Sequence, residues 1–200
     1  MTTDTARPAT RMLPLILLVV VIVAPALVAT TLYLSGWRPG ASSSHGELIV
    51  PPQPLPGMSL TSADGQALAD DALHGKWGLL YLLPQTCATE CRDVLLALRM
   101  VHVAQGREYQ RVQRIFLIDS EAPAAVPEAI AELLKDGLRA TADAGSVTAL
   151  RQTFEQAGGS AGEVYLVDPL GNLILRYRPD ADPKGMRKDL AHLLKHSWVG

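Results

Sequence analysis

Residues 81–95 read Tyr-Leu-Leu-Pro-Gln-Thr-Cys-Ala-Thr-Glu-Cys-Arg-Asp-Val-Leu. The order predicts an apolar strand, a short bend and the first turn of a helix. Cys87 and Cys91 are the two cysteines of the chain. Side chains four residues apart lie on one face of a helical turn, so we expect the two sulfurs to be neighbours. A helix N-terminus would also favour the thiolate of the first cysteine.

Several kinds of site can use two cysteines at this spacing. A structural disulfide across so short a loop would remove only about 2 kcal/mol of unfolded-state entropy, against roughly 4.7 kcal/mol for a 100-residue loop. The polar neighbours Gln85, Thr86 and Thr89 disfavour two deeply buried thiols. Zinc and iron–sulfur sites usually need four ligands, and c-type haem needs a Cys-x-x-Cys-His motif that is absent. A redox-active dithiol or a Cu(I) site remains, because soft thiolates select Cu(I).

The N-terminal part of the chain predicts a membrane anchor. Residues 12–34 carry no charged side chain and are long enough to cross a bilayer as a helix. Arg7 and Arg11 precede them, so the positive-inside rule predicts that residues 1–11 lie in the cytoplasm and the remainder outside it. A cleaved signal peptide is the alternative, with weak cleavage motifs between residues 24 and 29. Because the apolar run is longer than a usual signal sequence, we expect an uncleaved single-pass transmembrane helix.

Composition divides the rest of the chain into two parts. Residues 35–57 are rich in glycine, serine and proline, which predicts a linker. Residues 58–200 are expected to form the globular domain, which is long enough to bury a sizeable core. The net charge of the chain is −2, so nothing points to a nucleic-acid partner.

The apolar pattern of residues 58–200 predicts alternating strands and helices. Residues 77–83 form an almost continuous apolar run, which is typical of a strand buried on both faces of a sheet. The other expected elements are two short strands around an Asp64-Gly65 turn (58–68), a helix (89–104), a strand (111–119), a helix with proline in its first turn (127–135), a short strand (138–142), a helix capped by Ser146 (146–157), a β-hairpin (164–177) and a closing helix (182–196).

Buried strands that alternate with helices imply a layered α/β fold. In that fold the two cysteines follow the carboxyl end of a central strand, where open α/β sheets place their functional sites. We therefore predict a thioredoxin-like α/β fold with one N-terminal transmembrane helix.

At this point the sequence resembles the Sco/SenC family of thioredoxin-like, membrane-anchored copper proteins. The resemblance covers residues 58–196. The matching features are the Gly-Lys-Trp turn at 75–77, the Cys-x-x-x-Cys spacing of Cys87 and Cys91, the acid Asp119 at the end of a core strand, and the late hairpin turn at 165–171. Sco proteins help to assemble the binuclear copper centre of cytochrome c oxidase.

The chain departs from this family at two places. Arg92 follows the second cysteine, where the family usually has proline. Sco proteins bind copper with two cysteines and a histidine that lies shortly before the late hairpin strand. Here that segment, residues 158–163, contains no histidine, and Ser160 stands at about the place of the ligand. The resemblance therefore gives Cys87 and Cys91 as the redox and metal site and leaves the third copper ligand unknown.

The five histidines lie elsewhere in the sequence. His45, in the predicted linker, could fold back toward the cysteines as a ligand. The other four are predicted to lie on the surface or at helix ends: His74, His102, His192 and His196. Without a third ligand, Cys87 and Cys91 could still transfer two-coordinate Cu(I) or carry out thiol chemistry without a metal.

The resemblance implies a membrane-anchored factor for cytochrome c oxidase assembly, which acts through Cys87 and Cys91 by thiol reduction, by Cu(I) transfer, or by both. Its expected partner is a respiratory oxidase subunit or another thiol or copper protein. Its expected location is the bacterial inner membrane, with the C-terminal domain in the periplasm. A general extracytoplasmic thiol–disulfide oxidoreductase or a peroxiredoxin-like enzyme is the alternative, and a non-catalytic scaffold with a relic disulfide is the third hypothesis. Whether the protein is an enzyme stays open at this point.

Overall fold

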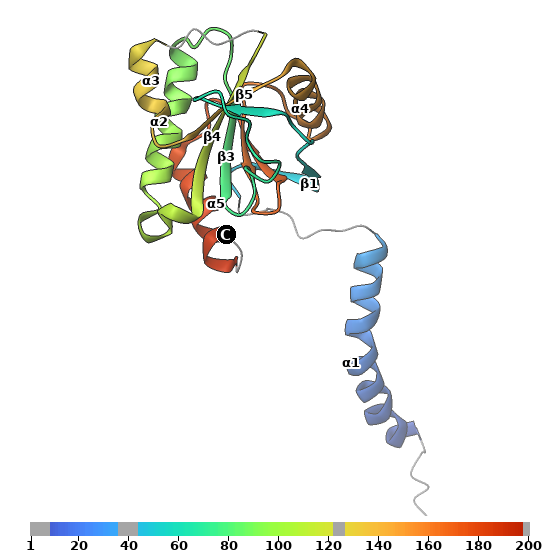
Figure 1. Cartoon of the computed structure of the whole chain (residues 1–200). Coiled ribbons are helices and arrows are strands. Elements are labelled where there is room, and N and C mark those ends of the chain that lie inside the picture. Colours follow the sequence, from blue (N-terminus) through green and yellow to red (C-terminus); the bar gives the residue numbers. More distant parts are fainter. Residues whose placement is uncertain (1–8, 36–43, 122–126, 198–200) are drawn as a thin grey trace, which may run out of the picture. The chain divides into compact units, whose positions relative to one another are not determined.

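The computed structural model describes residues 9–35, 44–121 and 127–197 (Figure 1). The chain divides into two compact units, Met1–Ser42 and Ser43–Gly200. The first unit holds a single described helix, and the second holds a seven-stranded sheet with helices on both faces.

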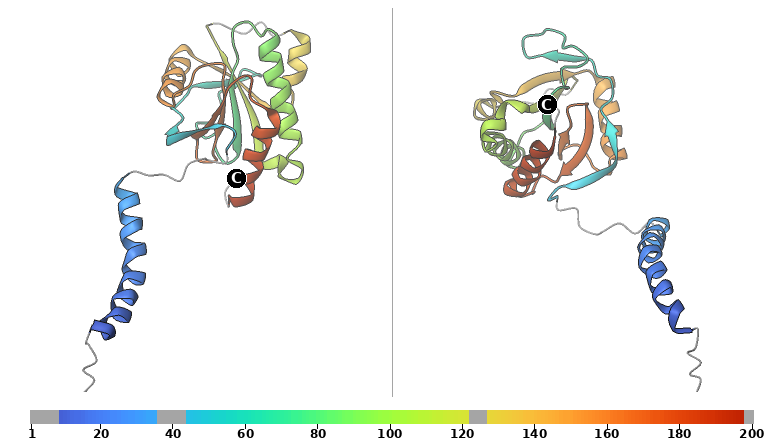
Figure 2. Two further views of the ribbon diagram at one scale, coloured as in Figure 1. Left: turned by 180° about the vertical axis from the view of Figure 1, so that it is seen from behind. Right: turned by 90° about the horizontal axis from the view of Figure 1, so that it is seen from below.

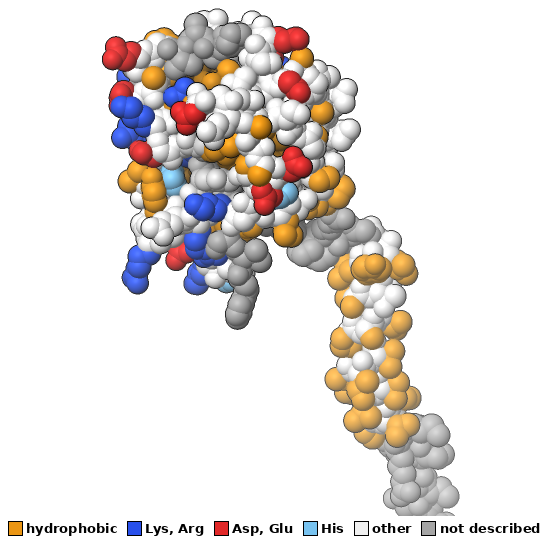
Figure 3. Space-filling model, in the orientation of Figure 1, with side chains coloured by type: hydrophobic (Ala, Val, Ile, Leu, Met, Phe, Trp, Pro, Cys, Tyr) orange, Lys and Arg blue, Asp and Glu red, His pale blue; other side chains and the backbone are white. Residues whose placement is uncertain are grey.

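Helix α1 (Ala9–Leu34) is built almost entirely from apolar residues, and from residue 14 onward its side chains are largely exposed (Figure 3). It contains Pro14 and Pro25. The span Pro14–Leu34 is long and apolar enough to cross a membrane, and in the described residues it is the one helix of this kind. An apolar helix over residues 12–34 is thus confirmed, whereas residues 1–8 of the flank predicted to be cytoplasmic (1–11) lie outside the described residues.

The second unit is organised around one mixed sheet, in the order β1-β7-β6-β3-β4-β5-β2. The strands are β1 (Glu47–Pro54), β2 (Leu60–Ser62), β3 (Trp77–Leu82), β4 (Val112–Asp119), β5 (Leu138–Ala142), β6 (Val164–Val167) and β7 (Asn172–Tyr177). Strand β3 lies at the centre, parallel to β4 and antiparallel to β6. Every residue of β3 is buried, as its continuous apolar sequence predicts.

Helices cover both faces of the sheet (Figure 2). They are α2 (Thr89–Val103), the 3₁₀-helix η1 (Gly106–Arg111), α3 (Glu128–Leu134), α4 (Ala144–Gln156) and α5 (Pro183–His196). One core lies between the sheet and α2, α3 and α5, and a second core lies between the sheet and α4. The predicted inward stripe of α2, made of Val94, Leu95, Leu98 and Val101, is buried in the first core.

Two local details differ from the sequence prediction. One strand, β2, and an isolated bridge between Thr61 and Ala67 replace the two short strands expected around the Asp64-Gly65 turn. Helix α4 begins before Ser146, because the carboxylate of Asp143 accepts a hydrogen bond of 2.7 Å from the Ser146 backbone N–H and so caps the helix. The hydroxyl of Ser146 instead accepts a hydrogen bond from the backbone N–H of Ser59.

Strand β1 occupies part of the segment that the sequence predicts to be a linker. It pairs antiparallel with β7, with Glu47 opposite Arg176, and Ile49 is buried. Proline is tolerated in a strand at the edge of a sheet, where its missing N–H faces away from the neighbouring strand. The folded unit therefore begins within residues 35–57 rather than after them, and residues 36–43 lie outside the described residues.

The carboxylate of Asp189 on α5 holds the start of this unit in place. It accepts hydrogen bonds from the backbone N–H groups of His45 (2.7 Å) and Gly46 (2.9 Å), and it lies 2.9 Å from His45 Nδ1. The Tyr177 hydroxyl donates a further hydrogen bond of 3.1 Å. Burial, and then the charge of Asp189, raise the pKa of Tyr177, so the phenol stays protonated and remains a donor. A nearly buried carboxylate is thus satisfied by three donor residues from two distant parts of the chain.

The histidines lie mostly where the sequence predicts them. His74, His192 and His196 are exposed, and His45 pairs with Asp189 instead of approaching the cysteines. His102 lies in the last turn of α2, at a helix end, but it is not on the surface, because its ring is buried and stacks on Tyr109 with ring centres 3.9 Å apart. Burial lowers the pKa of His102, which favours the neutral ring.

We predict that Asp189→Ala lowers the free energy of unfolding by about 2–4 kcal/mol, because it leaves the buried donors of Gly46 and Tyr177, and the partly buried N–H of His45, without an acceptor. Urea unfolding of the detergent-solubilised protein, followed by fluorescence, measures the change. Lys188→Ala, at the exposed neighbouring position, is the control and should alter stability by less than about 0.5 kcal/mol. Equal stability of the two variants would contradict the role given to Asp189.

Candidate functional site

The segment after β3 forms the bend that carries the cysteines. The Leu83 backbone N–H donates to the Leu117 carbonyl at 2.9 Å, which extends the pairing with β4 by one residue before Pro84 ends it. Helix α2 begins at Thr89, with Ala88 at its N-cap and no side chain acting as a cap. Cys87 therefore lies just before the helix, and Cys91 lies in its first turn, close to the predicted arrangement.

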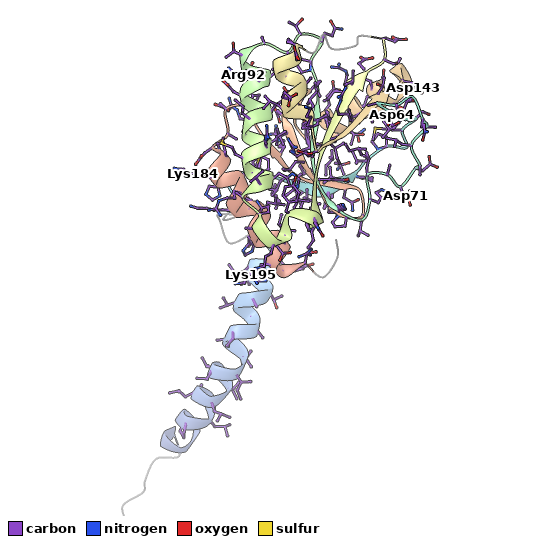
Figure 4. The ribbon with its side chains drawn as sticks, turned by 60° about the vertical axis from the view of Figure 1, so that its left-hand side comes forward. Asp64, Asp71, Arg92, Asp143, Lys184 and Lys195 are labelled. Atoms are coloured by element: carbon purple, nitrogen blue, oxygen red, sulfur yellow. A yellow bond between two sulfur atoms is a disulfide. The ribbon has the colours of Figure 1, made fainter. Side chains whose placement is uncertain are left out.

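Cys87 and Cys91 form a disulfide, with their Cα atoms 5.1 Å apart. This separation lies within the usual range for disulfides. The two cysteines differ in exposure: Cys91 is 4% exposed and belongs to the core under α2, whereas Cys87 is only partly buried. An attacking thiol can reach the Cys87 sulfur more easily than the Cys91 sulfur. The next residue of the helix, Arg92, is exposed (Figure 4).

A pocket with a volume of about 420 Å³ opens beside Cys91. Its lining includes Tyr81, Thr86 and Glu90 from the cysteine side, and Ser160, Glu163 and Arg178 from the loops before β6 and after β7. Burial, and then the charge of Glu90, raise the pKa of Tyr81 to about 12, so this phenol stays neutral. The pocket therefore presents hydroxyl, carboxylate and guanidinium groups next to the disulfide.

The loop that carries Ser160 is held in place against the sheet. The Tyr165 hydroxyl donates to the Ser160 carbonyl at 2.9 Å, and Ser160 Oγ lies 3.4 Å from the Glu163 carboxylate. Glu163 also pairs with Arg176 at 3.3 Å. Gly159 allows this close packing, because a Cβ at that position would lie 2.4 Å from the Tyr165 hydroxyl oxygen. The structure thus brings Ser160 to the pocket beside Cys91, as the resemblance suggested.

Other residues considered from the sequence are not among those that line this pocket. His45 is bound at Asp189, and Asp119 accepts a hydrogen bond of 3.0 Å from the Glu121 backbone N–H, as a residue that ends a strand often does. No histidine is among the residues that line the pocket. Across the described ranges, no group of three or more His, Cys, Asp or Glu residues is arranged to hold a metal ion.

Comparison with known families identifies the chain. A family profile described as "Transmembrane-like, thioredoxin-like, C-terminal domain" matches residues 77–197. The chain belongs to this family. The match runs from β3 to the residue after α5, so it includes the cysteine bend and the pocket. A comparison with curated proteins gives no match.

Solved structures confirm the thioredoxin-like fold and its resemblance to Sco proteins. Copper-bound ScoI from Arabidopsis thaliana is 19% identical, with a TM-score of 0.58 over 74% of this chain and 99% of that chain. A thiol:disulfide interchange protein from Bacteroides sp. is 14% identical, with a TM-score of 0.54 over 74% and 91%. BsSco, a Sco-family cytochrome c oxidase assembly protein with a disulfide switch, is 13% identical, with a TM-score of 0.55 over 76% and 98%. At these identities the likeness establishes the fold.

The residues around the pocket fit copper only in part. Once the disulfide is reduced, Cys87 and Cys91 offer two soft thiolates, which suit Cu(I). Ser160 and Glu163 add only hard oxygen donors, which are poor ligands for that ion. The donor set therefore fits a two-coordinate Cu(I) ion and does not fit a site with two sulfurs and one nitrogen.

We predict that Cys87 of the reduced protein reacts with iodoacetamide at least about tenfold faster than Cys91, because accessible thiolates are the ones that react and Cys91 is 4% exposed. Mass spectrometry of timed samples from the reduced, detergent-solubilised protein measures both rates. In denaturant the two rates should become similar, which controls for intrinsic reactivity. Faster alkylation of Cys91 in the folded protein would contradict the assignment of Cys87 as the outer sulfur.

Proposed function

We propose that this protein assists cytochrome c oxidase assembly as a membrane-anchored factor that exchanges the Cys87–Cys91 disulfide with cysteines of a target protein. The observation that carries the proposal is the unequal exposure of the two bonded sulfurs beside an open polar pocket. The fold shared with BsSco, an oxidase assembly protein described with a disulfide switch, supports it. The target is a respiratory oxidase subunit or another thiol or copper protein.

The exchange takes two steps. In the reduced protein the Cys87 thiolate attacks a disulfide of the target, so that a mixed disulfide forms and one target sulfur leaves as a thiolate. The Cys91 thiolate then attacks the Cys87 sulfur, which restores the Cys87–Cys91 disulfide and releases the second target sulfur. The target gains two electrons and this protein loses two, while the released thiolates take protons from solvent. An external dithiol reductant must return the protein to its reduced form.

Transfer of Cu(I) is the second chemistry that the same sulfurs can support. The two thiolates of the reduced form would hold the ion, and thiolates of the target would replace them one at a time. The copper-bound ScoI structure supports this version through its shared fold. The donor set around Ser160 argues for brief, two-coordinate binding rather than storage.

We propose that the protein lies in the bacterial inner membrane. Residues 1–11 would lie in the cytoplasm, 12–34 would form the anchor, and the folded domain would lie in the periplasm. Arg7 and Arg11 before the apolar helix support this orientation. An oxidising compartment, in which disulfides persist, suits the Cys87–Cys91 bond.

A general extracytoplasmic thiol–disulfide oxidoreductase is the second candidate. The fold shared with the Bacteroides thiol:disulfide interchange protein favours it. Such an enzyme would act on many disulfides, whereas an assembly factor would act on few. A peroxiredoxin-like activity would be recognised by peroxide consumption by the reduced protein.

Trapping of the target separates these candidates. We predict that Cys91→Ser accumulates a mixed disulfide between Cys87 and one predominant membrane partner, because the resolving thiol is missing. Affinity capture from cells, non-reducing gels and mass spectrometry identify the partner. Cys87→Ser is the matched control and should capture nothing. Capture of many unrelated proteins would favour the general oxidoreductase, and normal oxidase activity in cells that carry both substitutions would contradict a role in assembly.

Copper binding beside the pocket can be tested by introducing a histidine as a nitrogen ligand at position 160. We predict that Ser160→His raises the affinity of the reduced protein for Cu(I) by about tenfold or more, since position 160 lines the pocket beside Cys91. Competition with a chromophoric Cu(I) chelator measures the affinity. Ser160→Ala is the control and should bind like the unchanged protein. No gain with histidine would show that position 160 does not reach the metal held by the two cysteines.

A further inference from the structure

Two histidines of α5 lie together at the surface, away from the cysteines. His192 and His196 are one helical turn apart, both are exposed, and their ring centres are 4.6 Å apart with ring planes inclined by 53°. Side chains at i and i+4 of a helix project from the same face. Two imidazole nitrogens from such a pair can approach one ion together.

This pair is separate from the pocket beside the disulfide. His196 lines a pocket together with Trp77, the first residue of β3, whereas Cys87 lies in the bend beyond Leu82, the last residue of that strand. Six strand residues span about 20 Å. The histidine pair and the cysteine pair therefore lie toward opposite ends of β3 and cannot share one ion.

We propose that His192 and His196 form a surface site that binds one Cu(II) ion through their imidazole nitrogens. Imidazole is a favourable ligand for Cu(II), and Cu(II) stands at the top of the affinity order among divalent first-row metals. Within the described ranges, no third His, Cys, Asp or Glu residue joins the two histidines in a group suited to a metal, and water would supply further ligands. The site differs from the cysteine pair both in its donor atoms and in the oxidation state of copper that it selects.

The charges around the pair narrow the choice of ion. The exposed ionisable side chains of α5, apart from the two histidines, are all basic: Lys184, Arg187, Lys188 and Lys195 (Lys184 and Lys195 are labelled in Figure 4). The one acid of this helix, Asp189, is buried and bonded to His45. Asp168 also lines the pocket beside His196, but its carboxylate already accepts hydrogen bonds from Leu170 and Asn172. The donors of the proposed site are therefore two imidazoles, which suit Cu(II) better than the hard ions Mg²⁺ and Ca²⁺. The negative end of the helix dipole offsets part of the repulsion by the neighbouring lysines.

Titration with Cu(II) tests the site on the full-length, oxidised protein in detergent, purified without a polyhistidine tag. The intact disulfide keeps the two sulfurs from binding copper, so the outcome is independent of the proposed function. We expect a visible d–d absorption band and an electron paramagnetic resonance spectrum with splitting from two nitrogens. His192→Ala and His196→Ala should each weaken Cu(II) binding by about tenfold or more.

Two controls separate chelation by the pair from binding to any histidine. His74→Ala removes an exposed histidine that lies outside α5 and should leave binding unchanged. The His192→Ala, Ala191→His double variant keeps the number of histidines on α5 but separates the rings on the helix surface, and it should bind as weakly as His192→Ala. Binding of equal strength by the unchanged protein and by the His192→Ala, His196→Ala variant, or by the variant with the shifted ring, would overturn the proposal.

Discussion

Burial of β3 on both faces is the constraint on which the rest of the structure depends. Leu79 and Tyr81 enter the core under α2, α3 and α5, while Leu80 and Leu82 enter the core under α4. Full burial of such a side chain contributes about 1.5–3 kcal/mol. Both helical layers must therefore assemble before this strand is protected from water. The cysteine bend directly follows the carboxyl end of β3, so it is attached to a strand that is buried on both faces, while Cys87 stays only partly buried.

The sequence predicted those helices and strands that a pattern of neighbouring residues specifies. The apolar run of β3 and the helical stripe of α2 were both visible, because each is a repeating pattern of neighbouring residues. Strand β1 was not predicted, since its pairing joins Glu47 to Arg176, 129 residues later, and its prolines resemble those of a linker. The capping of α4 was assigned to the wrong residue, because Asp143 and Ser146 are both good caps and only the backbone geometry chooses between them.

The candidate site was likewise predicted only where its features depend on neighbouring residues in the sequence. The proximity of Cys87 and Cys91 follows from their spacing, and the structure bears it out. Their difference in exposure does not follow from spacing, because the helix start and the packing of α2 on the sheet determine it. Ser160 could be located only through a family resemblance. No sequence pattern marked Arg178 as a pocket residue, since it reaches the pocket from the loop after β7. A pocket formed by three loops is a property of the topology, not of any one segment.

The position of β1 has a consequence for the behaviour of the domain in solution. Exposed sheet edges can recruit strands from other molecules and start aggregation. One edge of this sheet is β2, which is only three residues long, and the other is β1, which contains Pro51, Pro52 and Pro54. Proline has no N–H to offer an incoming strand, so β1 covers β7 and is itself a poor template for further pairing. The same prolines that made the segment look unstructured thus help to keep the folded units of separate molecules from joining edge to edge.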